Sequence, residues 1–68
     1  MKLTSFVFEI KDGVAHITLD QAERGNPFDR QFARELNELA TECSVNSAVR
    51  SVLIDAKGRY FSVGGDLN

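Results

Sequence analysis

The chain has 68 residues, a formal net charge of −2 and one cysteine, so it is one small domain or a part of a larger one. It has no basic cluster and no apolar run of membrane-spanning length, which predicts neither a nucleic-acid nor a membrane partner. The lone cysteine, Cys43, excludes an internal disulfide and a cysteine-based metal site. We therefore expect no bound metal, a reducing cytoplasmic location, and a buried, inert Cys43.

The first predicted element is a β-hairpin over residues 5–20. Asp12-Gly13 is a strong two-residue turn signal between two alternating segments. A two-residue loop there places three apolar pairs on one face: Phe6 with Leu19, Phe8 with Ile17, and Ile10 with Ala15. The other face pairs Glu9 with His16, so we expect the only histidine to be structural rather than a general base.

A helix is predicted over residues 29–43, after an irregular loop. Two residues fit the N-cap position: Asn26, which places Pro27 at the first helical position, and Asp29, which allows a weak hydrophobic staple. We prefer Asp29. The following apolar residues recur at helical spacing, which is typical of core packing: Phe32, Leu36, Leu39, Ala40 and Cys43.

The next element is a strand over residues 49–56. Val52-Leu53-Ile54 is apolar without alternation, as in a strand that is covered on both faces. Strand, helix and strand form a βαβ unit, whose strands should be parallel. Ligands of open α/β sheets bind beyond the carboxyl ends of the strands, and residues 61–67 follow directly there.

Gly64-Gly65 is the most distinctive feature of this last loop. Glycine lets a ligand approach the main chain closely, and Asp66 is a good N-cap for a helix that starts after it. Unpaired N–H groups at such a helix start can hold a phosphate or a developing oxyanion. On the dipeptide alone, an ordinary turn remains the alternative.

The order of these elements and the motif Phe61-Ser62-Val63-Gly64-Gly65-Asp66-Leu67 resemble the N-terminal part of the crotonase superfamily, the enoyl-CoA hydratases and isomerases. The spacing back to the Asn26-Pro27-Phe28-Asp29 segment adds to the likeness, which covers essentially residues 1–68. The resemblance implies an α/β fold, the N-terminal ββαβ portion of a crotonase-like (ClpP/crotonase) spiral.

By the same resemblance, the chain is part of an acyl-CoA-binding enzyme of fatty acid metabolism, a lyase or an isomerase. Its substrate is a coenzyme A thioester, and no separate cofactor is implied. The catalytic group is the backbone N–H of Gly65, which serves an oxyanion hole. The implied CoA-binding residues are Arg24, Gly25, Ser62, Val63, Gly64, Gly65 and Asp66. For Arg24, a solvated loop arginine is the alternative to a phosphate contact.

The chain also departs from the family pattern, because family members are several-fold longer. The second oxyanion donor and the catalytic acid or base lie in later segments of such proteins, and no acidic residue here takes their place. We therefore expect the rest of the parent chain to be a partner and residues 1–68 to be inactive alone. The family also implies a homo-oligomer, a trimer or a dimer of trimers.

Two classes of function stay open. The first is an enzyme that carries out hydration, double-bond isomerisation, decarboxylation or thioester hydrolysis, since these reactions share the oxyanion hole. The second is a non-catalytic ββαβ module that packs on another chain.

Overall fold

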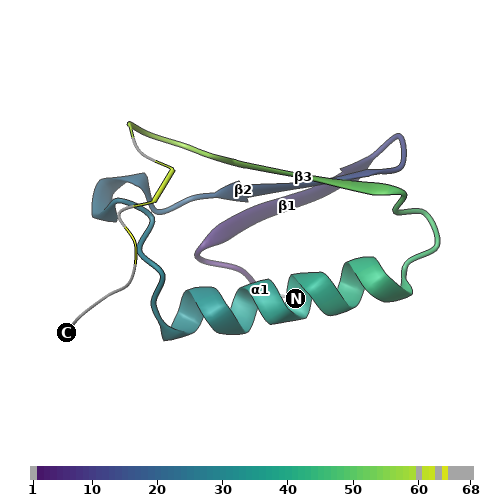
Figure 1. The fold of residues 1–68 in the computed structure, drawn as a ribbon, viewed down its shortest axis with the longest axis horizontal. Coiled ribbons are helices and arrows are strands. Elements are labelled where there is room, and N and C mark those ends of the chain that lie inside the picture. The colour runs from purple at the N-terminus through teal and green to yellow at the C-terminus, as the bar shows by residue number, and fades with distance from the viewer. Residues whose placement is uncertain (1, 60, 63, 65–68) are drawn as a thin grey trace.

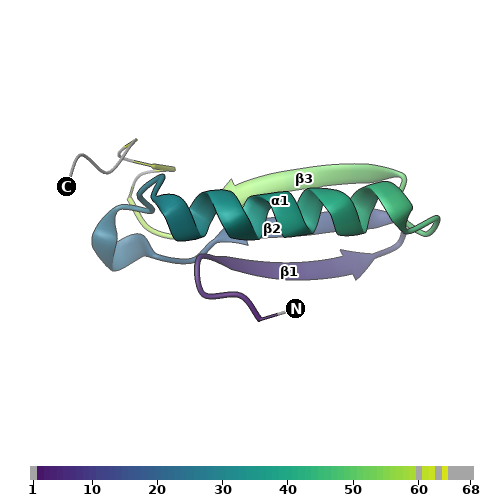
Figure 2. The same cartoon turned by 90° about the horizontal axis from the view of Figure 1, so that it is seen from below.

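A computed structural model describes residues 2–59, 61, 62 and 64 and has two layers, a sheet and one helix (Figure 1). Its elements are β1 (Phe6–Lys11), β2 (Val14–Leu19), the 3-10 turn η1 (Ala22–Arg24), α1 (Arg30–Val45) and β3 (Ser51–Ala56). The strand order within the described residues is β1-β2-β3. Figure 2 shows α1 running along the middle of the sheet, over β2. The fold is therefore mixed α/β, as predicted.

The hairpin has the predicted register. Phe6 lies opposite Leu19, Phe8 opposite Ile17 and Glu9 opposite His16. Both turn residues have left-handed backbones, with φ of 52° at Asp12 and 80° at Gly13. This is the two-residue turn whose twist suits an antiparallel pair, so the local turn fixes which side chains face the helix.

The core lies between the hairpin and the middle of α1. Phe6, Ile17, Leu19 and Leu39 are almost fully buried and contact one another. The ring of Phe32 packs against that of Phe6, with centroids 4.8 Å apart. Burial of these side chains supplies most of the hydrophobic stabilisation that the described residues can provide.

Helix α1 begins at the preferred cap. The Asp29 Oδ1 accepts a hydrogen bond from the Phe32 N–H at 2.9 Å, which satisfies one of the unpaired N–H groups of the first turn. The helix ends at Val45, two residues beyond the predicted position 43, and the Asn46 N–H closes it on the Glu42 carbonyl.

The apolar stripe of α1 is only partly core. Leu39 is buried and Phe32 and Cys43 are half-buried, but Leu36 and Ala40 are exposed. The prediction of core packing along the whole stripe, including a buried Cys43, is therefore wrong for the described residues. The three described strands do not cover the edge of the stripe that holds Leu36 and Ala40.

Strand β3 is parallel to β2, as predicted, with Leu19 opposite Ala56. It begins at Ser51 rather than at position 49, because the Arg50 and Ser51 N–H groups both donate to the Gly13 carbonyl. The expected cover on both faces is wrong for the described residues: Val52, Leu53 and Ile54 are 49%, 50% and 47% exposed. In the described sheet, β3 is an edge strand, so its side chains meet few neighbours. Among the described residues, no helix is long and apolar enough to cross a bilayer.

Candidate functional site

The loops that follow β2 and β3 meet at one end of the sheet. Because the two strands are parallel, their carboxyl ends lie at the same edge, and the Lys57 N–H donates to the Leu19 carbonyl at 3.0 Å. Figure 1 shows η1 and the last described residues together at this end, beyond the start of α1. The described site residues of the two loops, Arg24, Gly25, Ser62 and Gly64, therefore lie at the same end of the sheet.

Asn26 joins the two loops. It is 2% exposed, and its side-chain Oδ1 accepts from the Gln21 N–H at 2.7 Å. Its Nδ2 donates to the Lys57 carbonyl at 3.1 Å, across 31 residues of sequence. Sequence reasoning considered Asn26 only as a helix cap, and the structure gives that position to Asp29.

Ser62 fixes the segment that leads into the glycine pair. Its hydroxyl donates to the Asn26 carbonyl at 2.7 Å and accepts from the Gly64 N–H at 3.0 Å. The Gly64 carbonyl in turn accepts from the Phe28 N–H at 2.9 Å. Gly64 has φ of 95°, a backbone conformation that favours glycine. Both main-chain groups of Gly64 are thus already bonded within the protein.

Arg24 and Gly25 lie at the end of η1. The Arg24 guanidinium donates to Gln21 Oε1 at 2.6 Å and forms an ion pair with Asp29 Oδ2 at 3.3 Å. The Phe32 N–H, and then Arg24, lower the pKa of Asp29. Gly25 ends η1 with φ of 78°. Arg24, whose side chain is half-exposed, is thus paired with the N-cap of α1 in this structure, and its predicted contact with CoA stays a prediction.

The remaining predicted site residues, Val63, Gly65 and Asp66, lie outside the described residues, so their contacts stay predictions.

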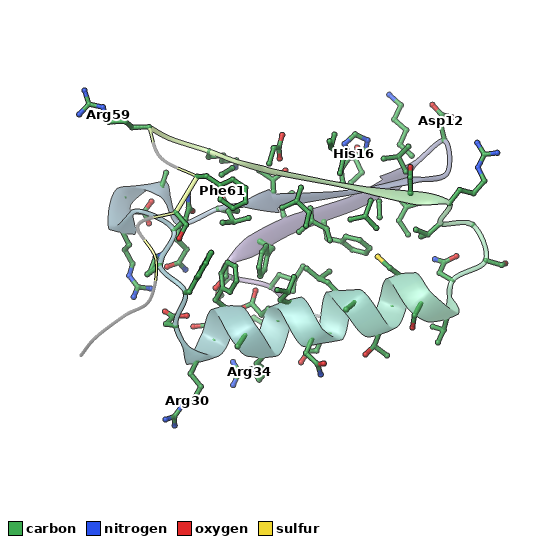
Figure 3. The ribbon with its side chains drawn as sticks, in the orientation of Figure 1. Asp12, His16, Arg30, Arg34, Arg59 and Phe61 are labelled. Carbon is green, nitrogen blue, oxygen red and sulfur yellow. The ribbon has the colours of Figure 1, made fainter. Side chains whose placement is uncertain are left out.

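An apolar hollow lies next to the two loops and was not foreseen from the sequence. It has a volume of about 450 Å³ and lies between the start of α1 and the ends of the strands. Its lining residues are Phe6, Leu19, Phe28, Asp29, Phe32, Ala33, Leu36, Ile54 and Phe61. Figure 3 shows the Phe61 side chain near the loops, between the level of the sheet and that of the helix. The aromatic residues that flank the two loops, Phe28 and Phe61, were the signal that could have indicated it.

Glu35 is a buried carboxylate that sequence reasoning also missed. It is 2% exposed. Its Oε1 accepts from the Thr4 and Ser5 N–H groups at 3.0 and 2.9 Å, and its Oε2 accepts from the Thr4 hydroxyl at 2.9 Å. Burial raises the pKa of Glu35, but these hydrogen bonds outweigh burial and leave the pKa below its ordinary value. Its position three residues after Phe32 and four before Leu39, on the apolar stripe, was the available signal.

The Lys57 Nζ and the Asp20 Oδ1 form an ion pair at 2.8 Å where the two loops meet, whereas several other charged groups lie away from the loops. Figure 3 shows His16 on the face of the sheet opposite the helix, Asp12 at the hairpin tip, and Arg30 and Arg34 on the outer side of α1. Among the described residues, no group of three or more His, Cys, Asp and Glu side chains is arranged to hold a metal ion. What the described residues show is a glycine-containing loop, fixed by hydrogen bonds, beside an apolar hollow.

Comparison with known proteins shows which family has this sequence and fold. The family model of the enoyl-CoA hydratases/isomerases matches residues 9–68. The chain belongs to the enoyl-CoA hydratase/isomerase family.

Individual relatives agree with that assignment. The chain is 33% identical over 67 residues to a trans-2-decenoyl-[acyl-carrier-protein] isomerase of Streptococcus mutans, covering 98% of this chain and 26% of that protein. It is 37% identical over 54 residues to a mitochondrial delta(3,5)-delta(2,4)-dienoyl-CoA isomerase of Mus musculus, covering 79% and 16%.

Solved structures show the same fold. The crystal structure of an enoyl-CoA hydratase from Shewanella pealeana superposes with a TM-score of 0.93 at 30% identity, covering 98% of this chain and 25% of that one. The predicted crotonase-like fold is thereby confirmed. The chain spans about a quarter or less of the length of the curated relatives described above.

Proposed function

We propose that the chain supplies one backbone donor of an oxyanion hole, the Gly65 N–H, to an enzyme that acts on acyl thioesters by hydration or isomerisation. We propose further that Arg24, Gly25, Ser62, Val63, Gly64 and Asp66 form part of its CoA-binding surface. The second donor and the acid or base come from other residues of the complete protein. Membership of the enoyl-CoA hydratase/isomerase family supports this proposal.

The observation that carries the proposal is the bonding of Gly64. Its N–H is taken by the Ser62 hydroxyl at 3.0 Å, so this amide is not the proposed donor. Its carbonyl accepts from the Phe28 N–H. Because both main-chain groups of Gly64 are bonded within the protein, we take the next amide along the chain, that of Gly65, as the donor.

The chemistry needs a fixed donor. When a proton is removed next to a thioester, or a nucleophile adds to its double bond, negative charge builds on the thioester oxygen. A preorganised N–H stabilises this charge without reorganising during the reaction. The hydrogen bonds among Asn26, Ser62 and Gly64 hold the main chain of Gly64, the residue before the proposed donor, in one position.

The acyl carrier and the reaction are separate questions. One relative is named for an acyl-carrier-protein substrate and another for an acyl-CoA substrate, and a thioester is common to both. Arg24 forms an exposed ion pair with Asp29, and a guanidinium has further donors that can contact a phosphate. We propose that the site requires only the thioester and no further cofactor.

We propose separately that the complete protein is a cytoplasmic homo-oligomer.

One observation favours the second class of function, a non-catalytic packing module. Val52, Leu53 and Ile54 leave a half-exposed apolar surface on β3, which suits packing against other residues. An enzyme can use the same surface for its own core, so only a test of catalysis separates the two classes.

The test uses Gly65 in the complete protein encoded by the gene. Proline removes the N–H at this position, so Gly65→Pro should lower kcat/KM by about a hundredfold or more. Gly65→Ala keeps the donor and should retain much of the activity. Binding of the acyl thioester should fall less than kcat/KM, because the contact strengthens as charge develops.

The measurements are hydration and isomerisation rates with a panel of enoyl thioesters, thioester dissociation constants from calorimetry, and circular dichroism of each variant. Val63→Ala is the comparison variant: it leaves every backbone donor in place and should spare kcat, although it can weaken binding of the thioester. A folded Gly65→Pro protein with wild-type kcat/KM would exclude the oxyanion role, and a wild-type protein inactive on the whole panel would favour the packing module.

A further inference from the structure

We propose that Asn26 is a positioning residue, which fixes the loop after β3 and thereby places the Gly64-Gly65 main chain for catalysis. The inference rests on the proposed function, because it assumes that this main chain binds the reacting thioester. Asn26 itself is 2% exposed, so it acts through other residues and not by touching the substrate.

The backbone of Asn26 is held in an uncommon conformation. Its φ is 50°, in the left-handed region, although it carries a side chain. Asparagine tolerates this region better than most residues, but a residue stays there only when its surroundings hold it. Here the side-chain amide holds the backbone, because its Oδ1 accepts from the Gln21 N–H and its Nδ2 donates to the Lys57 carbonyl. The Asn26 N–H adds a further bond to the Gln21 carbonyl at 2.9 Å.

This conformation sets the direction of the Asn26 carbonyl. The carbonyl oxygen accepts a hydrogen bond from the Ser62 hydroxyl at 2.7 Å, and the same hydroxyl accepts one from the Gly64 N–H at 3.0 Å. A continuous path of hydrogen bonds thus runs from the end of β3, through the buried amide and its carbonyl, to the residue before Gly65. Because hydrogen bonds are directional, we expect a shift of Asn26 to displace Gly64.

A simpler role for Asn26 is to close its own loop, through the Gln21 contact alone. The two roles use different atoms of the amide. Loop closure uses the Oδ1 acceptor and the Asn26 backbone N–H, which donates to the Gln21 carbonyl, whereas the tie to Lys57 after β3 needs the Nδ2 donor. Asn26→Asp separates them, because aspartate keeps the size and the acceptor and replaces the donor with an oxygen that faces the Lys57 carbonyl.

The experiment measures kcat and KM per folded active site in the complete protein, for Asn26→Asp, Ser62→Ala and the double variant. We expect Asn26→Asp to lower kcat by about tenfold to a hundredfold, the scale of an ångström-size misplacement of a catalytic group. KM should change much less, since the lost interaction belongs to the transition state. The double variant should be no slower than the slower single variant, because both changes break one path.

The matched control is Asn46→Asp at the other end of α1. That amide also both accepts and donates, from the Ala48 N–H at 2.9 Å and to Glu42 Oε2 at 3.4 Å. The same chemical change there should leave kcat at the wild-type value. Thermal unfolding of all variants reports loss of folding separately from loss of kcat.

A folded Asn26→Asp protein with wild-type kcat overturns the inference, and so does a double variant whose losses multiply. If Asn26→Asp does not fold, Ser62→Ala decides alone, and an unchanged kcat then overturns the path through the hydroxyl. Gly65→Pro, measured in parallel, tests the proposed function separately. If Gly65→Pro is harmless the oxyanion assignment fails, whereas a damaging Gly65→Pro beside a harmless Asn26→Asp rejects only the positioning role.

Discussion

The hairpin, residues 6–19, and the loop end of the sheet are held by different kinds of contact. In the hairpin, each strand residue lies opposite a partner that the turn brings close, and four side chains are buried: Phe6, Ala15, Ile17 and Leu19. The loop end consists of residues 20–28 together with Lys57, Gly58, Ser62 and Gly64. Side-chain hydrogen bonds join its two parts across 31 and 36 residues of sequence.

This difference means that the hairpin mainly stabilises the fold, whereas the loop end mainly fixes the position of main-chain groups. Apolar burial in the hairpin is non-directional and contributes in proportion to area. The polar contacts of the loop end are directional and few, so they specify where a main-chain group lies more than they stabilise the fold. Loops that a rigid scaffold positions are where binding and catalytic groups concentrate, which agrees with the proposed place of the site.

The largest stability effect should therefore come from the hairpin. Phe6→Ala should lower the unfolding free energy of the complete protein by about 3–5 kcal/mol, as for other large aromatic truncations in cores. Phe6 is 3% exposed and packs against Phe32. Phe8→Ala is the matched control, and its loss should be smaller because Phe8 is only half-buried. Urea unfolding of both variants tests this, and equal losses would contradict the core assignment.

The same difference explains what could be predicted from the sequence. The hairpin register follows from Asp12-Gly13 and strict alternation, and the Asp29 cap follows from local spacing, so both are local signals. The parallel pairing of β3 follows from general rules of chain connection. These features needed no knowledge of distant contacts.

Features that depend on distant contacts could not be predicted. The role of Asn26 as a joint requires Lys57 and Ser62 to be near it in space. Glu35 reads as a surface glutamate until Thr4 and Ser5 lie over it. The exposure of β3 depends on which other residues cover it, and the apolar pattern of the strand itself does not give this information. The assignment of Gly65 stays a prediction, because that residue lies outside the described ones.

Glu35 should have the next largest effect, because it ties the segment before β1 to α1. Glu35→Ala leaves the buried Ser5 N–H without its acceptor and should cost roughly 3 kcal/mol of unfolding free energy, the scale of lost hydrogen bonds to a charged group. Glu35→Gln keeps one acceptor oxygen and should cost less. An Ala variant as stable as the Gln variant would show that the carboxylate contacts contribute little.

The effect of Glu35 should also depend on pH. The pKa of the folded protein lies below the ordinary value of 4.5, so the carboxylate stabilises the fold fully above pH 4.5 and loses its effect as pH falls through the lower, folded pKa. The difference in unfolding free energy between wild type and Glu35→Gln should therefore shrink as the pH falls below 4.5. Urea titrations at a series of pH values measure it, and a difference independent of pH would contradict the assignment.

The smallest effect on stability should come from the loop end, at Gly58. This glycine has φ of 91°, and a Cβ built on it would lie 2.7 Å from the Cβ of Ala22 in η1. Gly58→Ala adds backbone strain and a clash, for which we expect a loss of about 1–3 kcal/mol, less than for Phe6→Ala. Because the turn at Gly58 lies between Lys57 and Ser62, kcat should fall more than this modest destabilisation accounts for.

Ala22→Gly separates the two parts of the Gly58 effect. Removing the Ala22 methyl group relieves the clash but leaves the left-handed strain at position 58. Gly58→Ala should therefore cost less stability in the Ala22→Gly protein than in the wild type, but it should still cost some. If Gly58→Ala costs as much stability as Phe6→Ala with kcat per folded molecule unchanged, the loop end is a stabilising element. The proposed difference between the hairpin and the loop end would then be wrong, because the contacts of the loop end would contribute to the unfolding free energy and not to kcat.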